Sequence, residues 1–108
     1  MKLVAVALAA AACLATGPEA RAADASAGEA LAKSSGCLAC HSVDKKLVGP
    51  AYKDIAAKYR NDKGALERLA KKVKEGGKGV WGDIPMTPNG HVKDADIKTI
   101  VAWVLSLK

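Results

Sequence analysis

The sequence predicts an all-α protein. Apolar residues recur at the three- and four-residue spacing of an amphipathic helix in four separate segments. No segment alternates apolar and polar residues convincingly enough to form a strand. Glycine and proline gather between the helical segments, where they interrupt regular structure. We therefore expect about four short helices joined by irregular loops.

The four predicted helices have recognisable ends. Their apolar positions fall within residues 27–34, 52–59, 66–73 and 97–104. Asp24 or Ser26 can cap the first helix, and Asp94 suits the start of the fourth. Gly76-Gly77 should end the third. The following segment, residues 76–91, contains five glycines and two prolines and is predicted to be irregular.

The first 22 residues have the pattern of a secretory signal peptide. Lys2 precedes an apolar run over residues 3–15, and Ala20-Arg21-Ala22 is a small-x-small cleavage site. The apolar run is too short and too rich in alanine for a membrane span. We expect residues 1–22 to be cleaved, which leaves a single domain, residues 23–108, in the periplasm without a membrane span.

Cys37-Leu38-Ala39-Cys40-His41 is the most informative motif, because Cys-x-x-Cys followed by His is the attachment signature of a c-type haem. Two thiols on one turn reach the two vinyl groups of a single porphyrin, and the adjacent imidazole ligates the iron. Cys37 and Cys40 are thus the predicted attachment residues, and His41 is the predicted first axial ligand.

A zinc site, a thioredoxin-like site and a structural disulfide fit this motif less well. A zinc site wants four ligands and normally a second cysteine pair, which the chain lacks. A thioredoxin-like motif should follow a strand, and no β-rich run precedes Cys37. A structural disulfide between Cys37 and Cys40 stays open in an oxidising compartment, but it leaves His41 without a role.

The composition suggests that the haem is structural as well as functional. Residues 23–108 number 86, which is little chain from which to bury a core. Phenylalanine is absent, and aromatic residues make up only 4% of the chain, so a buried porphyrin would supply the large apolar body that is missing. We expect the haem-free chain to be largely unfolded or molten.

Iron held by one histidine needs a second axial ligand or keeps an open site, and this choice separates electron carriers from enzymes. Met86 is the strongest candidate, because it is the only methionine after residue 22 and lies between Pro85 and Pro88, which restrict its backbone. A lone methionine can also be core filler. His91 is the rival ligand, but a histidine after Asn89-Gly90 is more typical of an exposed turn.

Together these motifs resemble the short, single-haem bacterial class I cytochromes c, in particular those that donate electrons to periplasmic nitrite reductase. The resemblance rests on Gly36-Cys37-x-x-Cys40-His41, Val48-Gly49-Pro50-Ala51-Tyr52, Gly79-Val80-Trp81-Gly82, Ile84-Pro85-Met86 and Trp103-Val104-Leu105-Ser106. It covers essentially all of residues 23–108. It implies a small cytochrome c fold, about four short helices wrapped around one covalently bound haem c, with His41 and Met86 as axial ligands.

The resemblance also implies roles for residues around these ligands. Pro50 would accept a hydrogen bond from the His41 ring, which fixes the orientation of the imidazole. The Trp81 indole N–H would meet a haem propionate, although ordinary packing would also account for this tryptophan. The Asn89 amide would approach the methionine sulfur. Lys72 stands where some relatives have an arginine directed toward a propionate, and lysine supplies the charge without the bidentate fork.

The chain is basic, with 17 Lys and Arg against 11 Asp and Glu. Removing Lys2, Glu19 and Arg21 with the signal peptide leaves 15 against 10. Several lysines are candidates for a collar beside the haem edge that steers the protein toward acidic docking surfaces on redox partners. They are Lys45, Lys46, Lys71, Lys72, Lys74 and Lys78. A surface that only keeps the protein in solution is the alternative. Nucleic-acid binding is not expected, because the basic residues are not interleaved with stacking aromatics.

The sequence therefore predicts a monomeric, soluble periplasmic electron carrier that is not an enzyme. The resemblance implies nitrite reductase or a terminal oxidase as the electron acceptor, with a quinol-oxidising complex among the periplasmic redox partners. The alternative is a haem-based enzyme or gas sensor with an open or displaceable sixth ligand. Met86 discriminates between the two, because a protein ligand at the sixth position leaves no place for a substrate on the iron.

Overall fold

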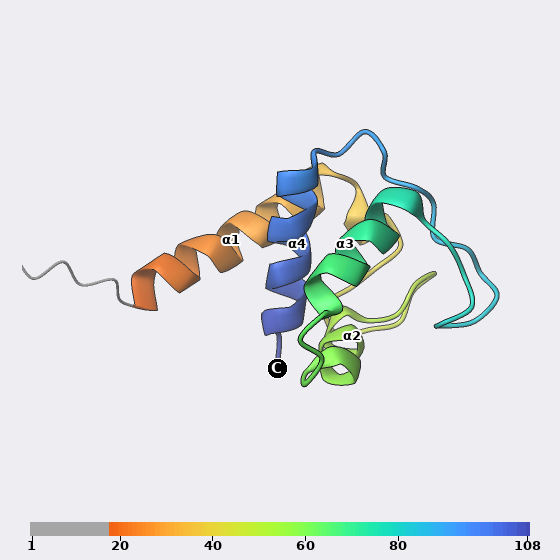
Figure 1. The fold of residues 1–108 in the computed structure, drawn as a ribbon, viewed down its shortest axis with the longest axis horizontal. Helices are drawn as coiled ribbons and strands as arrows, with labels where there is room; N and C mark the ends of the chain where they lie inside the picture. Colours follow the sequence, from red (N-terminus) through yellow and green to blue (C-terminus); the bar gives the residue numbers. More distant parts are fainter. Residues whose placement is uncertain (1–17) are drawn as a thin grey trace, which may run out of the picture.

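The computed structural model describes residues 18–108, and these residues form a small helical domain (Figure 1). The helices follow in the order α1 (Pro18–Ser34), η1 (Cys37–Ala39, a 3₁₀ helix), α2 (Tyr52–Tyr59), α3 (Ala65–Glu75) and α4 (Asp94–Ser106). Within the described residues there is no β-strand, only two isolated bridges, His41 with Lys46 and Gly77 with Met86. The predicted all-α class and its four helices are confirmed.

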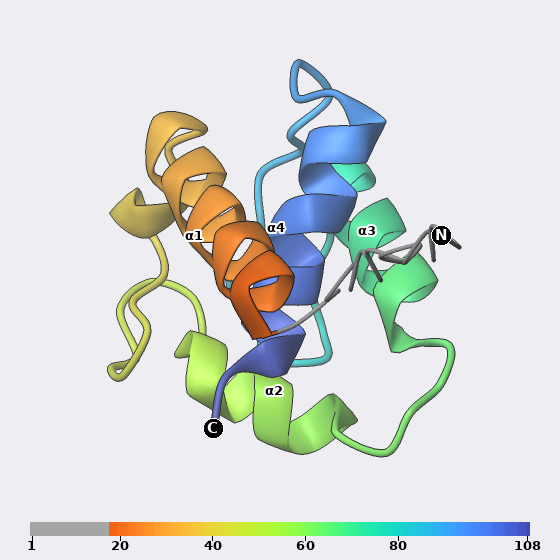
Figure 2. The ribbon, with the colours of Figure 1, turned by 90° about the vertical axis from the view of Figure 1, so that its left-hand side faces the viewer.

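Helix α4 is the centre of the domain. Helices α1 and α3 lie on opposite sides of it, and α2 also packs against it (Figures 1 and 2). One buried cluster joins α1, α2 and α4 through Ala32, Tyr52, Ile100, Trp103 and Val104. A second joins α3 and α4 through Ala70, Val92, Ile97 and Val101. The predicted apolar faces of α2, α3 and α4 therefore lie in the core, whereas the face of α1 was predicted wrongly. Ala27 and Ala30 are exposed, and α1 instead buries Gly28 and Ala32.

The close crossing of α1 and α4 depends on Gly28. A Cβ atom at this position would collide with the Trp103 Cβ and lie 2.8 Å from the Thr99 carbonyl oxygen. Trp103 in turn meets the Tyr52 ring edge-on, with centroids 5.5 Å apart. The missing side chain thus allows α1 to approach α4 closely enough to bury the indole.

Helix α1 begins farther upstream than the sequence predicted. Asp24 and Ser26, the expected caps, lie within the helix, because α1 starts at Pro18 and continues through an alanine-rich stretch. Proline suits the first turn of a helix and alanine has the highest helix propensity, so the sequence can extend the helix past both caps. Residues 1–17 of the predicted signal peptide lie outside the described residues, and its cleavage stays a prediction.

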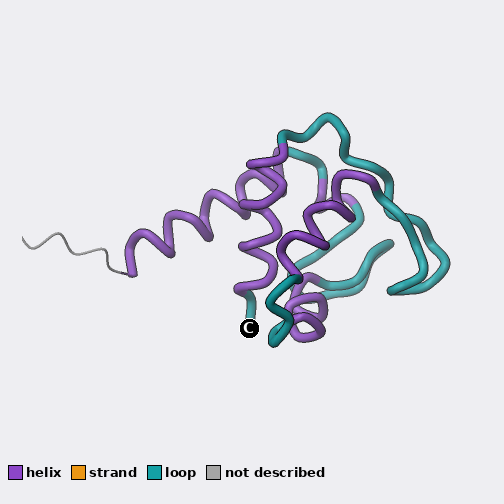
Figure 3. The backbone as a smooth tube through the Cα atoms, in the orientation of Figure 1, coloured by secondary structure: helices purple, strands orange, loops and turns teal. Residues whose placement is uncertain are grey.

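The other predicted boundaries are close to the observed ones. Gly76 follows α3 with a φ of 72°, and its N–H donates to the Lys72 carbonyl at 2.7 Å. Asp94 is the first residue of α4, whereas Lys93 occupies the N-cap position. The loop between η1 and α2 and the loop between α3 and α4 lie on the same side of the domain (Figure 3). No helix among the described residues is long and apolar enough to cross a membrane.

Candidate haem-binding site

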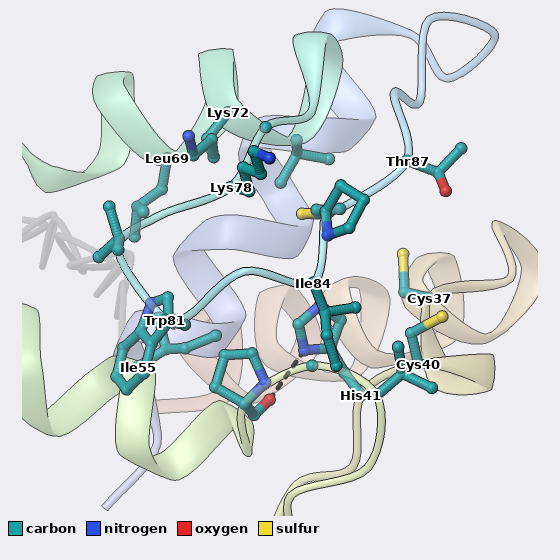
Figure 4. A pocket seen from close by; sticks show the side chains of 18 of the residues that line it. Cys37, Cys40, His41, Ile55, Leu69, Lys72, Lys78, Trp81, Ile84 and Thr87 are labelled. Atoms are coloured by element: carbon teal, nitrogen blue, oxygen red, sulfur yellow. Dashed lines mark hydrogen bonds between the residues drawn. The ribbon is translucent and has the colours of Figure 1, made fainter.

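A cavity of about 570 Å³ opens between these two loops and the helices behind them. Every residue of the predicted haem-binding set lines it, whereas the rival ligand His91 does not. The set consists of Cys37, Cys40, His41, Pro50, Trp81, Met86 and Asn89. Figure 4 shows Cys37, Cys40 and His41 on one side, with Leu69, Lys72 and Lys78 toward α3. The tertiary structure thus brings two distant segments of the sequence to one site.

The turn that carries the cysteines is tightly wound. Gly36 precedes it in the left-handed conformation, with a φ of 80°. The backbone N–H groups of Cys40 and His41 both donate to the Cys37 carbonyl, at 3.2 and 3.0 Å. A 3₁₀ turn places residues three apart on one side, so the thiols of Cys37 and Cys40 can reach one ligand. Both cysteines are free, Cys37 half-buried and Cys40 exposed.

The imidazole of His41 lies in a closely fitted slot and is only 8% exposed. Its Nδ1–H donates to the Pro50 carbonyl at 2.8 Å, the hydrogen bond expected from the sequence. The Tyr52 ring stacks on the imidazole, with centroids 4.9 Å apart and planes 18° from parallel. A Cβ at Gly49 would lie 2.6 Å from His41 Cε1, so the backbone there also touches the ring. With Nδ1 engaged, Nε2 keeps its lone pair for a metal.

Met86 is held by its backbone on the second loop. Its N–H donates to the Gly77 carbonyl at 2.7 Å, and the Gly77 N–H donates back to the Met86 carbonyl at 3.1 Å. The Met86 carbonyl lies so close to Gly76 that a Cβ there would collide with it. The glycines that end α3 therefore also allow the backbone of Met86 to pack against them.

The remaining predicted contacts lie at the edge of the cavity. Trp81 is 42% exposed, and the Lys58 ammonium lies 5.7 Å from its ring centroid, a cation–π distance. The Asn89 side-chain amide donates to the carbonyls of Val73 and Thr87, at 3.2 and 3.1 Å. Both N–H groups of the Asn89 amide thus donate to backbone carbonyls. The expected contacts of Trp81 with a propionate and of Asn89 with the sulfur stay predictions.

Burial favours the neutral form of two groups on the cysteine side of the cavity, the Cys37 thiol and the Tyr52 hydroxyl. Burial raises the pKa of the Cys37 thiol, and a hydrogen bond with Tyr52 offsets part of that shift. Burial also raises the pKa of the Tyr52 hydroxyl, and a negative charge on Cys37 would raise it further. Both groups therefore stay protonated, which suits a cavity for a large apolar ring.

The lysines grouped as one collar divide between two places. Lys46, Lys72 and Lys78 line the large cavity. Lys71 and Lys74 instead line a second cavity, of about 240 Å³, between α3 and α4, and Lys45 lines neither. Helical spacing accounts for the division, because positions 69, 72 and 73 of α3 point to one side and positions 70, 71 and 74 to the other. The predicted collar is thus correct for three of its six members.

Comparisons with known proteins agree with this site. The model of the family described as cytochrome c matches residues 25–108. The chain belongs to the cytochrome c family. Cytochrome c-551 of Allochromatium vinosum is 60% identical over 77 residues, which is 71% of this chain and 82% of that protein. The crystal structure of Nitrosomonas europaea cytochrome c552 superposes with a TM-score of 0.72 at 55% identity, covering 74% of this chain and 99% of that one. The class 1 cytochrome MtoD of Sideroxydans lithotrophicus ES-1 has a TM-score of 0.67 at 38% identity, covering 78% and 96%.

The chain is thus a small class I cytochrome c with one haem, and its cofactor is covalently bound haem c. The residues present fit that cofactor. A cavity of several hundred cubic ångströms carries two free thiols, an imidazole with one uncommitted nitrogen and a thioether among its lining groups. No other residue set is needed to attach the porphyrin and ligate the iron.

Sequence reasoning missed two residues of the cytochrome site, Gly49 and Tyr52. Both belong to the run Val48-Gly49-Pro50-Ala51-Tyr52 that carries the family resemblance, but neither was given a role beside the haem or the iron. Both touch the His41 ring, although they follow His41 by eight and eleven residues in the sequence. The run Gly49-Pro50-Ala51-Tyr52 was a signal for them. Gly49 is small enough to approach a ring and precedes Pro50, whose carbonyl accepts the His41 hydrogen bond, and the aromatic Tyr52 follows.

Proposed function

We propose that this cytochrome c is a soluble periplasmic electron carrier in which His41 and Met86 are the axial ligands of the haem iron. Cys37 and Cys40 are the two residues that attach the haem. The observation that carries the proposal is the single cavity into which the Cys-x-x-Cys-His turn and the methionine loop both contribute their side chains. Bound haem iron supplies a one-electron couple between its ferric and ferrous states.

The chain's own residues favour a carrier over an enzyme. The hydrogen bond to Pro50 and the contacts with Gly49 and Tyr52 hold the His41 imidazole in one orientation. Met86 is placed by its paired backbone hydrogen bonds with Gly77. Ligands held in this way change little between two oxidation states, which keeps the reorganisation that accompanies electron transfer small. Two protein ligands also leave no axial position for a substrate.

The rim of the cavity has the character of a docking surface. Val48, Val80, Trp81 and Ile84 line the cavity and are 42–65% exposed. Lys46, Lys72 and Lys78 lie among them, and Lys58 covers the Trp81 ring. An apolar patch with a basic surround favours transient contact with an acidic surface. We propose that the monomer exchanges electrons here with periplasmic redox proteins such as nitrite reductase, a terminal oxidase or a quinol-oxidising complex.

Met86→Ala is expected to remove the weak red-end methionine-to-iron band from the spectrum of the oxidised holoprotein. The reduction potential should fall by on the order of 0.1 V, a fraction of the roughly 0.8 V range that axial ligands set. A redox titration followed by visible absorption measures both effects. His91→Ala is the control, because His91 is exposed on the same loop, does not line the cavity and should leave band and potential unchanged.

A wild-type spectrum without the band, together with binding of carbon monoxide or peroxide to the resting protein, would contradict Met86 as ligand. That result would favour the haem-based enzyme or gas sensor with an open or displaceable sixth ligand.

The lysines at the cavity should steer an anionic partner. Reduced holoprotein is expected to transfer an electron to hexacyanoferrate(III) roughly tenfold more slowly as ionic strength rises from low to high values. Stopped-flow rates should lose most of this dependence in a variant with Lys46, Lys72 and Lys78 all replaced by glutamine. The control is a variant in which Lys33, Lys71 and Lys98 are replaced by glutamine. These three lysines lie outside the cavity lining, and the loss of charge is the same. Equal slopes for the two variants would refute local steering.

A further inference from the structure

The methionine loop, residues 76–93 between α3 and α4, is attached to the last turn of α3 at several points. The Gly77 and Met86 backbones pair near its start. Three residues after Met86, the backbone N–H of Asn89 donates to the Val73 carbonyl at 3.0 Å, and its side-chain amide donates to the same oxygen at 3.2 Å. The loop is thus held against α3 around the methionine.

Lys74 makes a further attachment near the end of the loop. Its ammonium group donates to the Val92 carbonyl at 2.7 Å and lies 3.0 Å from an Asp94 carboxylate oxygen. The carboxylate is on a side chain that is 82% exposed, where an ion pair contributes little. The bond to the carbonyl is partly buried and has a charged donor, so it is the stronger of the two contacts.

A run of hydrogen bonds connects Lys74 with the residues just after Met86, because the Asn89 side-chain amide donates to the Thr87 carbonyl at 3.1 Å. The Val92 N–H donates to the Asn89 carbonyl at 3.1 Å, and Asn89 in turn donates to Val73. The Val92 side chain is buried in the core between α3 and α4, so the carbonyl that Lys74 holds belongs to a fixed point of the loop. Without this bond, the hydrogen bonds of Asn89 to Val73 would be the only ones among the described residues that tie the stretch from Asn89 to Val92 to α3, beside the packing of the Val92 side chain.

We propose that Lys74 is a positioning residue for the distal ligand, which keeps Met86 at its place by holding the end of the methionine loop to α3 through the Val92 carbonyl. The proposal rests on the proposed function, because it takes Met86 as the ligand. Lys74 therefore acts within the protein, not on its partners, although its charge resembles that of the lysines at the cavity.

Binding of imidazole to the oxidised holoprotein tests the proposal, because imidazole reaches the iron only when Met86 has left it. The apparent affinity for imidazole rises with the fraction of molecules in which the loop is open and Met86 has left the iron. Lys74→Met should bind imidazole about fivefold more tightly than wild type, in the range that loss of one typical intramolecular hydrogen bond produces. The Asn89 backbone amide, followed by NMR in the ferrous protein, should exchange its hydrogen about fivefold faster. Lys74→Arg should restore both values.

Two variants separate this role from general stabilisation. Lys98→Met removes the same charge and another ion pair between α3 and α4, with Glu67 at 3.5 Å, but no bond to the loop. Asp94→Asn removes the ion pair of Lys74 and keeps its bond to Val92. Both should match wild type in imidazole affinity and amide exchange.

Equal imidazole affinity in Lys74→Met and Lys98→Met would overturn the proposal, and so would an Asp94→Asn variant that behaves like Lys74→Met. Failure of the proposed function looks different. In that case wild type lacks the methionine-to-iron band, and Met86→Ala binds imidazole no more tightly than wild type does.

Discussion

With Cys37 and Cys40 replaced by alanine and no haem bound, the chain is expected to lack stable tertiary structure. The reason is the cavity of about 570 Å³ at which α2, α3 and α4 all present apolar side chains. They include Ile55, Leu69, Val73, Ile100 and Val104. At about 24 cal/mol per Å³, a dry void of this size costs on the order of 10 kcal/mol, which is as large as the whole stability of a typical domain. The haem-free chain relieves this cost by collapse or by admitting water, and both disrupt the native packing of the helices around the cavity.

Far-ultraviolet circular dichroism and thermal unfolding of the purified double variant measure this effect. We expect reduced helix content and no cooperative transition. Met86→Ala is the control, because it keeps both cysteines and so the covalently bound haem, and it should retain native helicity. A double variant with full helicity and a cooperative transition would show that the side chains alone are a sufficient core.

Gly28→Ala is expected to lower the free energy of unfolding of the holoprotein by about 2–3 kcal/mol, because the added methyl group forces two helices apart. Its Cβ would collide with the Trp103 Cβ and approach the Thr99 backbone, neither of which can rotate away. Alanine is normally the better residue within a helix, by about 0.5–1 kcal/mol, so the expected sign is opposite to that of helix propensity.

Thermal unfolding should show this loss as a Tm lower by roughly 10–20 °C for a domain of this size. Gly90→Ala is the matched control, because a Cβ at Gly90 meets no atom within 4 Å. Its Tm should stay close to that of wild type. A Gly28→Ala protein as stable as wild type would mean that α1 can shift along α4 without loss of packing.

The features that could be predicted from sequence are those that depend on neighbours a few residues apart. Helical spacing located the apolar faces of α2, α3 and α4, and Gly76 marked the end of α3 because only a few residue types accept its backbone conformation. Both the start and the buried face of α1 were placed wrongly, because alanine favours a helix on either side of the expected caps and many small residues leave its apolar face weakly marked. A turn at the two cysteines was expected from the attachment motif, but its 3₁₀ form was not, since three residues are too few to show a helical period.

The chemistry of the site followed from sequence where one short motif contains it. Cys37, Cys40 and His41 lie within one five-residue motif. Met86 stood out because no other methionine follows the predicted signal peptide. The bond from His41 to Pro50 was inferred from a family resemblance and is present. The slot around His41 was not foreseen, because Gly49 and Tyr52 reach the ring only after the loop has folded back over it.

The helical class, the attachment motif and the candidate ligands follow from the sequence, because they depend on spacing and residue type within short segments. Three other features are visible only in the folded chain: which lysines lie at the haem cavity, how closely α1 crosses α4, and that Lys74 bonds to the end of the methionine loop. These depend on distances between residues that are far apart in the chain. Such distances are set by how whole faces of helices pack, and a local pattern of residues does not contain them.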